Sequence, residues 1–246
     1  MRALDNLNAA EISSGQISFG MSEAEITQSL DEKGYAILKG VISELECQVL
    51  ADGYDVEDPY RSRVVMSRHG FGQGEYKYFG YPLPDLITRL RTKLYEPLAI
   101  IGNRWNELMN IDQRFPETHQ QYLDVCHKAG QVKATPLILQ YGEGDYNCLH
   151  QDVYGELLFP LQVACLLSKP GEDFTGGEFV LTEQRPRMQS RVEVVPLDQG
   201  DAVIFPVRHR PKQGTRGIYR VNMRHGVSEI RSGQRHTLGI IFHDAQ

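Results

Sequence analysis

The stretch PLILQYGEGDYNCLHQD, residues 136–152, decides how the second half of the chain is interpreted. It begins with a short apolar run, continues through two glycines, and ends on a histidine and an aspartate one residue apart. Because residues i and i+2 of an extended segment point to the same side, the side chains of His150 and Asp152 can converge on one point. The stretch therefore predicts a strand and a turn that lead into two candidate metal ligands.

Short β-rich runs with turn residues between them continue from Thr135 to the C-terminus. Besides PLILQY they are LQVACLLS (161–168), GEFVLTE (177–183), VEVVPL (192–197), DAVIFP (201–206), YRVNMRHGVSEI (219–230) and HTLGIIFH (236–243). Such spacing is typical of an all-β sandwich or barrel and not of alternating βαβ units. We therefore expect a β jelly roll over residues 135–246.

The first 134 residues are predicted to be mainly helical. Ser22 and Ser43 each begin a capping box, and the helices they open should end at Gly34 and Gly53, with the strand YAILKGV (35–41) between them. Amphipathic patterns predict further helices over 85–109, with a kink at Pro97, and over 116–130. The fold class expected is mainly β with a helical N-terminal half, in a single domain spanning 1–246.

Composition limits the class of protein. The 246 residues are 41% hydrophobic, enough for one sizeable core. The four cysteines contain no Cys-x-x-Cys pair, which argues against a disulfide framework or a zinc ribbon and favours a reducing compartment. Neither a signal peptide nor a membrane-spanning run is recognised. We expect a soluble, cytoplasmic protein with no membrane partner and no obligatory protein partner.

The net charge of −6 is unevenly distributed. Residues 1–58 carry twelve acids against three basic residues, whereas residues 185–235 carry eleven Lys or Arg against four acids. A basic stretch can attract an anionic ligand or nucleic acid. For a chain that is acidic overall, the favoured interpretation is that the two regions neutralise each other across the fold.

A third metal ligand would complete a facial triad, in which two histidines and one carboxylate leave other positions open for chemistry. His225 is the best placed, because it lies within a predicted strand, and His209 is the alternative. Ten residues after His225 comes Arg235, whose guanidinium could bind a carboxylate bidentately. Thr237 would face the same way, and Tyr141 could add a phenol, although a single strand arginine is more often a surface residue.

Taken together, these elements resemble the Fe(II)/2-oxoglutarate-dependent oxygenases, in particular the prolyl-4-hydroxylase-like branch. The resemblance covers residues 135–246 and rests on four segments in the family's order: Tyr141–Asp152, Gly176–Phe179, Gly200–Phe205, and His225–Val227 with Arg235. The chain also resembles a bacterial group named for oxidative demethylation of damaged DNA. It departs from the AlkB-type demethylases, because no second arginine follows Arg235.

The resemblance implies a double-stranded β-helix flanked by helices, with Fe(II) bound by His150, Asp152 and His225. The cosubstrate 2-oxoglutarate would be held by Arg235 with Thr237 or Tyr141. Dioxygen would oxidise it to succinate and carbon dioxide, coupled to hydroxylation of a C–H bond or oxidative demethylation. No catalytic residue beyond the metal centre is implied.

The substrate region expected from the sequence is 58–84, where basic and aromatic residues alternate with glycines that suggest a mobile lid. Arg68, Tyr76, Tyr78 and Tyr81 are the candidates there for stacking on a nucleotide or single strand. They could equally enclose a peptide or a metabolite, or only pack against the jelly roll. The substrate is thus alkylated nucleic acid, a protein side chain or a small metabolite. A non-catalytic cupin-like module would not need Arg235 and Thr237.

Overall fold

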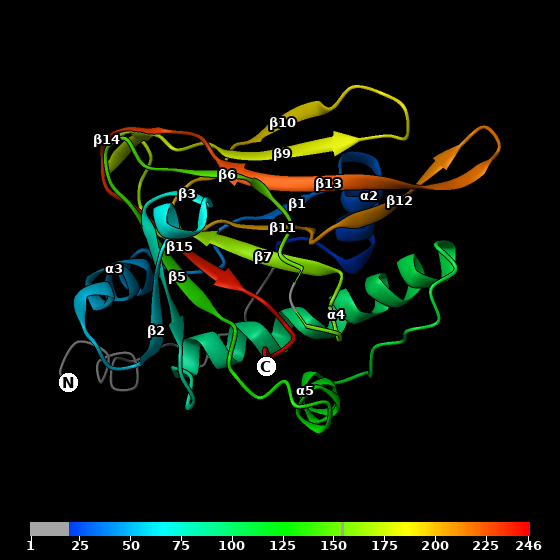
Figure 1. The fold of residues 1–246 in the computed structure, drawn as a ribbon, viewed down its shortest axis with the longest axis horizontal. Helices are drawn as coiled ribbons and strands as arrows, with labels where there is room; N and C mark the ends of the chain where they lie inside the picture. Colours follow the sequence, from blue (N-terminus) through cyan, green and yellow to red (C-terminus); the bar gives the residue numbers. More distant parts are fainter. Residues whose placement is uncertain (1–19, 154) are drawn as a thin grey trace.

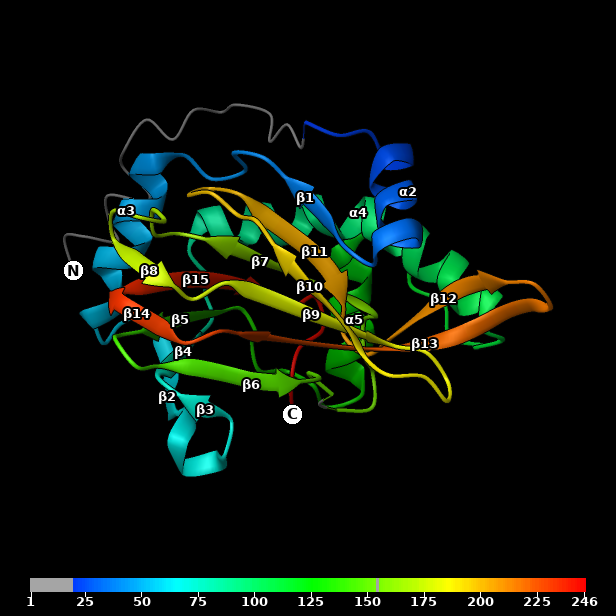
Figure 2. The ribbon, with the colours of Figure 1, turned by 90° about the horizontal axis from the view of Figure 1, so that it is seen from above.

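The computed structural model describes residues 20–153 and 155–246, which form two antiparallel sheets facing each other (Figures 1 and 2). The larger sheet has the strand order β1-β11-β7-β15-β5-β4-β2. In that order its strands are Ala36–Leu38, Ala202–Pro206, Leu161–Leu166, Arg235–Ile240, Leu137–Tyr141, Glu75–Phe79 and Tyr60–Val65. The chain crosses between the two sheets several times, as from β5 to β6 to β7 and from β10 to β11 to β12, which is the connection pattern of a jelly roll.

The second sheet has the order β10-β9-β13-β6-β3, and β12 also pairs with β13. These strands are Arg191–Val195, Phe179–Gln184, Gly217–Val227, Tyr146–His150, Gly72–Gln73 and, for β12, His209–Gly214. A separate pair, β8 (Phe174–Gly176) and β14 (Ile230–Gly233), closes one end. The strands expected after residue 135 are all confirmed. The structure adds β6, β8, β12 and β14, which the sequence patterns did not indicate.

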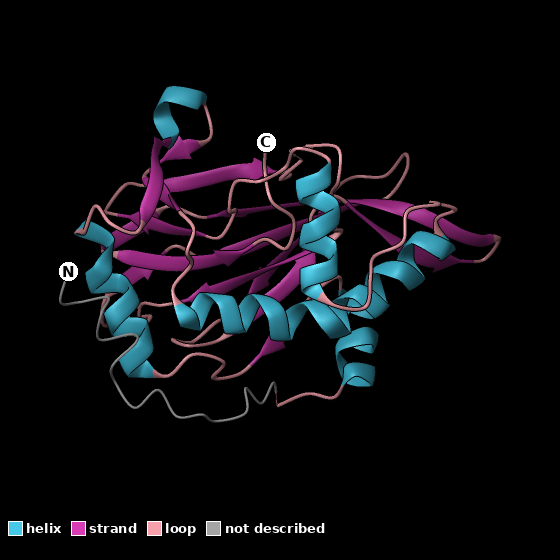
Figure 3. Ribbon diagram, turned by 90° about the horizontal axis from the view of Figure 1, so that it is seen from below, coloured by secondary structure: helices cyan, strands magenta, loops and turns pink. Residues whose placement is uncertain are grey.

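Within the described residues, four α-helices lie mainly on the side of the larger sheet, with α4 crossing its outer face (Figure 3). They are α2 (Glu23–Lys33), α3 (Glu44–Asp52), α4 (Asp85–Leu108) and α5 (His119–Lys128). Both expected capping boxes are present, and a third begins α5 at Thr118. α4 continues through Pro97. None of the helices in the described residues combines the length and apolarity needed to cross a bilayer.

The prediction of a helical N-terminal half was wrong in one segment. Residues 60–79 form β2, β3 and β4, so that this segment contributes strands to both sheets. The short 3-10 helix η2 (Met66–His69) connects β2 to β3. The segment that we expected to be a glycine-rich lid is therefore largely paired into the jelly roll.

Alternation along the strands separates two interiors. On β15, Leu238 and Ile240 pack in the large core beneath α4, whereas Arg235 and Thr237 line the space between the two sheets. A smaller apolar cluster between the sheets includes Phe179 and Phe205. Because β15 is buried on both sides, the side chains of Arg235 and Thr237 are held inside the molecule.

Candidate metal centre

Three side chains meet between the sheets at the end of β6. His150 is the last residue of β6, and Asp152 lies two residues after it. His225 on β13 lies directly across from His150. Each offers a ligand atom, and these atoms all lie within 4.8 Å of one another. Among the described residues, a search for three or more His, Cys, Asp or Glu side chains close enough to share a metal ion gives these three. We call these three residues the triad.

The geometry of the triad leaves suitable atoms directed inward. His150 Nδ1 lies 2.7 Å from the backbone oxygen of Cys148, to which it donates, so that the lone pair of its Nε2 remains available. That Nε2 is 3.3 Å from Asp152 Oδ1, and His225 Nε2 is 3.2 Å from Asp152 Oδ2. Two imidazoles and one carboxylate with other positions open form a donor set suited to Fe(II).

The three side chains of the triad shift one another's pKa values. Burial raises the pKa of Asp152, but the interactions with His225 and His150 outweigh it and hold that pKa well below its ordinary value. Burial and the neighbouring His150 lower the pKa of His225. Burial lowers the pKa of His150, but the hydrogen bond and the charge of Asp152 raise it by more, so the pKa of His150 is raised overall. The carboxylate is thus charged at neutral pH and attracts positive charge to the centre of the triad.

Arg235 lies in the same cavity and is 1% exposed. Its Nη1 donates to Thr237 Oγ1 at 2.5 Å, while its Nε has no hydrogen-bond partner in the described residues. None of the carboxylates in residues 20–153 and 155–246 lies within ion-pair distance of it. Burial lowers its pKa to about 10, which leaves it charged at neutral pH. A buried, unpaired guanidinium is a site for an anion.

The shape of the chain around Arg235 depends on Gly177. This residue has φ +62°, and a Cβ added there would lie 2.9 Å from Arg235 Cδ and closer still to a methyl group of Ile230. The first residue of the Gly-Glu-Phe run therefore has to be glycine for Arg235 to occupy its position. The rings of Tyr141 and Phe174 flank the guanidinium at 5.8 and 5.7 Å.

One cavity connects the triad to Arg235. Tyr141 and Thr237, the other two residues expected to bind the cosubstrate, also line it. The remaining walls are largely apolar and are formed by Leu137, Leu139, Val163, Ala164, Phe179, Phe205, Val227 and Ile241. The structure therefore brings all six residues expected to bind metal and cosubstrate into one cavity.

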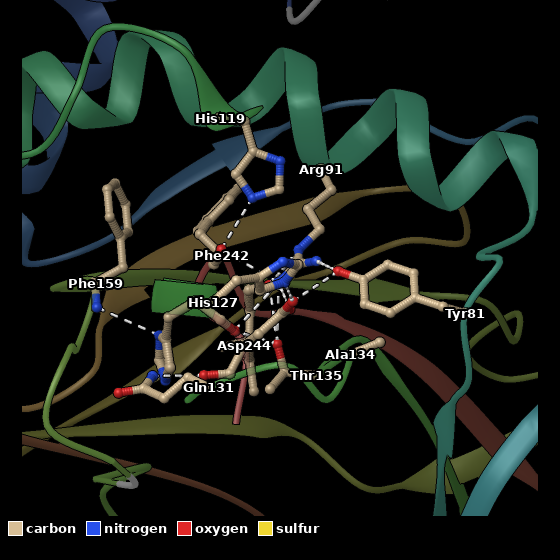
Figure 4. A network of polar contacts seen from close by, with 12 residues as sticks. Tyr81, Arg91, His119, His127, Gln131, Ala134, Thr135, Phe159, Phe242 and Asp244 are labelled. Carbon is tan, nitrogen blue, oxygen red and sulfur yellow. Dashed lines mark hydrogen bonds and ion pairs between the residues drawn. The ribbon is translucent and has the colours of Figure 1, made fainter. Parts of the chain in front are cut away.

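The four residues expected to contact substrate do not form one group. Arg68 is exposed on η2, and Tyr76 and Tyr78 on β4 are in edge contact, with ring centroids 5.4 Å apart. Burial raises the pKa of both tyrosines, and the charge of Asp152 raises it further. Both tyrosines therefore lie within electrostatic reach of the triad. Tyr81 instead donates to Asp244 at 2.8 Å, in a separate polar network (Figure 4).

The remaining histidines lie elsewhere. His209 pairs with Asn222 across β12 and β13, outside the triad, and His69 stacks on Phe71 at the surface. His119 and His127 bind the C-terminal segment, through Phe242 O and Asp244 Oδ2 respectively (Figure 4). Arg220, Asn222 and Arg224 point away from the buried face of β13 that carries His225.

Two residues of the site were missed by the sequence patterns. Gln162 donates through Nε2 to Asp152 Oδ2 at 2.8 Å, and that nitrogen lies 3.4 Å from His225 Nε2. Asn147 donates to the Tyr141 hydroxyl at 3.2 Å. A single amide within the apolar run LQVACL was a usable signal for Gln162, because buried polar groups require partners.

Comparison with known proteins gives a family. The profile of a family described as "Oxygenase, catalysing oxidative methylation of damaged DNA" matches residues 74–245. The chain is also 48% identical over 167 residues to proteins from two strains of Mycobacterium tuberculosis, both described as uncharacterized. That similarity covers 68% of this chain and 72% of each relative.

Solved structures share the fold at low sequence identity. A Pseudomonas putida prolyl-4-hydroxylase superimposes with a TM-score of 0.53 at 12% identity, covering 89% of this chain and 96% of that one. SnoN, a non-heme alpha ketoglutarate dependent epimerase from nogalamycin biosynthesis, gives 0.53 at 14% identity, with coverages of 88% and 80%. An oxidoreductase of the 2OG-Fe(II) oxygenase family from Burkholderia pseudomallei gives 0.50 at 16% identity, with coverages of 92% and 93%.

Proposed function

Because this chain belongs to the family described as oxygenases of damaged DNA, we propose that it is an Fe(II)- and 2-oxoglutarate-dependent dioxygenase. It couples oxidative decarboxylation of 2-oxoglutarate to succinate with hydroxylation of a substrate C–H bond, or with oxidative demethylation. The observation that carries this proposal is the single cavity that holds both the triad and the unpaired guanidinium of Arg235.

His150, Asp152 and His225 are the proposed ligands of Fe(II). When bound there, the metal supplies the centre at which dioxygen is activated at the expense of 2-oxoglutarate. The chain's own contribution is to orient the donors. Cys148 O fixes the tautomer of His150, and Gln162 holds the Asp152 carboxylate from the side through its amide.

Arg235 is the proposed anchor for the far carboxylate of 2-oxoglutarate. The guanidinium is aimed by its hydrogen bond to Thr237 and by the flanking ring of Tyr141. A bidentate pair with a carboxylate would satisfy the buried Nε that now lacks a partner. The cavity thus offers one carboxylate-binding end and one metal-binding end, which matches a dicarboxylate that also chelates the metal.

The apolar walls have a protective role. Val163, Ala164 and Phe205 line the space between the two polar ends, and Phe205 packs against His225 with ring centroids 4.7 Å apart. They exclude water from the centre, which strengthens the electrostatic attraction of both ends for their ligands.

The proposed substrate is an alkylated base in nucleic acid. Support comes from the description of the family and from Tyr76 and Tyr78, aromatic rings within electrostatic reach of Asp152. Aromatic side chains stack on bases regardless of sequence. A protein side chain or a small metabolite is the alternative within the same chemistry.

The test is anaerobic addition of Fe(II) and then 2-oxoglutarate, with the visible absorption band of the chelated cosubstrate as the readout. We expect a band in the wild type, no band in His225→Ala, and a band in Arg235→Ala only at far higher 2-oxoglutarate. Arg231→Ala is the matched control, because Arg231 is exposed and lies outside the cavity. Absence of a band in the metal-loaded wild type would favour a non-catalytic, cupin-like module.

A further inference from the structure

β13 pairs with β12 and with β9 (Figure 2). A second pocket lies beside Asn222, where the two pairings meet. It has about 500 Å³ of empty space and is open to solvent. Its lining comes from the end of β9 and the turn after it, from β12 and from β13: Gln184, Arg185, Pro186, Arg187, His209, Arg220 and Asn222. Three arginines and a histidine thus surround one space, and no acidic side chain lines it.

Most of the guanidinium donors around this pocket are unused. Each arginine has five N–H donors. Within the described residues, Arg187 makes no side-chain hydrogen bond or ion pair, and Arg220 uses only Nη2, which donates to Met109 O at 2.5 Å. Arg185 uses Nε, which donates to Glu183 Oε1 at 3.1 Å. The pocket therefore offers a large set of free donors to a ligand with several oxygen atoms.

Direct ion pairs do not link the pocket to the acidic N-terminal region. Among residues 20–58, no carboxylate forms an ion pair with a basic residue of 185–235. Glu183 is shared among Arg185, Arg210 and Lys212. Burial, Arg208 and Arg220 lower the pKa of His209, which reports the positive potential at this position.

The pocket adjoins the segment that carries the triad. Gln151, which lies between His150 and Asp152, donates through Nε2 to Asn222 Oδ1 at 3.2 Å and to Met223 O at 2.7 Å. Asn222 lines the pocket and lies three residues before His225 on β13, with its side chain on the opposite face of the strand.

We propose that the pocket formed by Arg185, Arg187, His209, Arg220 and Asn222 is a phosphate-binding subsite for the substrate of the adjacent centre. A phosphodiester carries one negative charge and a phosphomonoester up to two, and both present more acceptor oxygens than a carboxylate, so several guanidiniums can bind one phosphate. The phosphate source favoured is a phosphodiester of single-stranded nucleic acid, which presupposes the substrate class proposed above. A free nucleoside monophosphate has the same chemistry and is separated from it by the test.

The test measures binding of the full-length protein to a fluorescent oligothymidylate over a range of salt concentrations. We expect Arg187→Gln and Arg220→Gln each to weaken binding 5- to 10-fold at low salt. Each should reduce the slope of log K against log salt by about 0.7, the value for one phosphate contact on a single strand. Arg191→Gln is the control of equal charge change, because Arg191 is exposed on β10 outside the pocket and should leave the slope unchanged.

Three further measurements separate the outcomes. Competition by thymidine monophosphate as strong as that by the oligomer would assign the subsite to a free phosphomonoester, and competition by polyglutamate at equal charge would reject phosphate as its ligand. Equal losses in Arg187→Gln and Arg191→Gln would also overturn the subsite, because they would reflect net charge alone. Succinate formation in the absence of DNA tests the oxidising centre separately: we expect it to be unchanged in Arg187→Gln.

Discussion

Arg91 and Arg235 are both buried to 1% exposure, yet their surroundings differ in one respect. Arg91 on α4 is fully engaged: Nε donates to Ile241 O at 2.8 Å, Nη1 to the Tyr81 hydroxyl, and Nη2 to Asp244 Oδ1 at 2.7 Å (Figure 4). Arg235 on β15 has one hydrogen bond, to Thr237, and an unpartnered Nε.

The difference separates architecture from ligand binding. A buried charge is costly unless it is paired and hydrogen-bonded. The network around Arg91 satisfies that condition within the chain and attaches the C-terminal segment to α4. Around Arg235 the condition is left unmet by the described residues, so the missing partner is expected to be a ligand.

The largest expected effect is on stability, at Arg91. In Arg91→Met the carboxylate of Asp244, which is 0% exposed, loses its guanidinium partner. We expect a loss of about 3–5 kcal/mol in the free energy of unfolding, the range for breaking a buried ion pair. Denaturant titration measures it, with Arg89→Met, an exposed position on the same helix, as the control. A loss equal to that of the control would show that the network does not stabilise the fold.

The second prediction concerns Arg235. Without 2-oxoglutarate, Arg235→Gln should change the free energy of unfolding by no more than about 1 kcal/mol, because one hydrogen bond is lost and an unpaired buried charge is removed. With Fe(II) under anaerobic conditions, 2-oxoglutarate at 100 times its Kd should stabilise the wild type by about 2.7 kcal/mol. A 100-fold weaker Kd in the variant leaves about 0.4 kcal/mol.

The measurements on Arg235→Gln can contradict the distinction drawn between Arg235 and Arg91. A loss of 3 kcal/mol or more in ligand-free Arg235→Gln would place Arg235 in the same structural role as Arg91. If 2-oxoglutarate stabilised Arg235→Gln as much as it stabilises the wild type, Arg235 would not be part of the ligand-binding site.

Strands of the jelly roll could be predicted from sequence where apolar residues dominate, as in β7 and β11. β2 and β4, with sequences YRSRVV and EYKYF, were missed because their alternating residues are long amphipathic side chains. These bury their stems while keeping polar tips exposed, so a hydrophobic pattern does not reveal them. Glycine-rich segments around them reinforced the interpretation as a loop.

The site was predictable to the extent that it is local. The i, i+2 spacing of His150 and Asp152 indicated convergence, but the register that places His225 opposite His150 depends on a bulge in the pairing of β6 with β13. The hydrogen bond of Tyr81 to Asp244 was not predicted, because Asp244 lies 163 residues further along the chain. Contacts of that range leave no signal in a local pattern.

The smallest expected effect concerns Thr237, whose hydroxyl accepts the hydrogen bond that Arg235 makes within the described residues. Thr237→Val keeps the shape of the side chain but removes the Oγ1 that accepts from Arg235 Nη1. Because a single hydrogen bond contributes about 0.5–1.5 kcal/mol, we expect the Kd for 2-oxoglutarate to rise roughly 3- to 10-fold. Thr237→Ser retains the hydroxyl and should restore near wild-type affinity, as measured by anaerobic titration with Fe(II). If valine had no effect, the flanking rings of Tyr141 and Phe174 would be sufficient to aim the guanidinium, and Thr237 would only fill space.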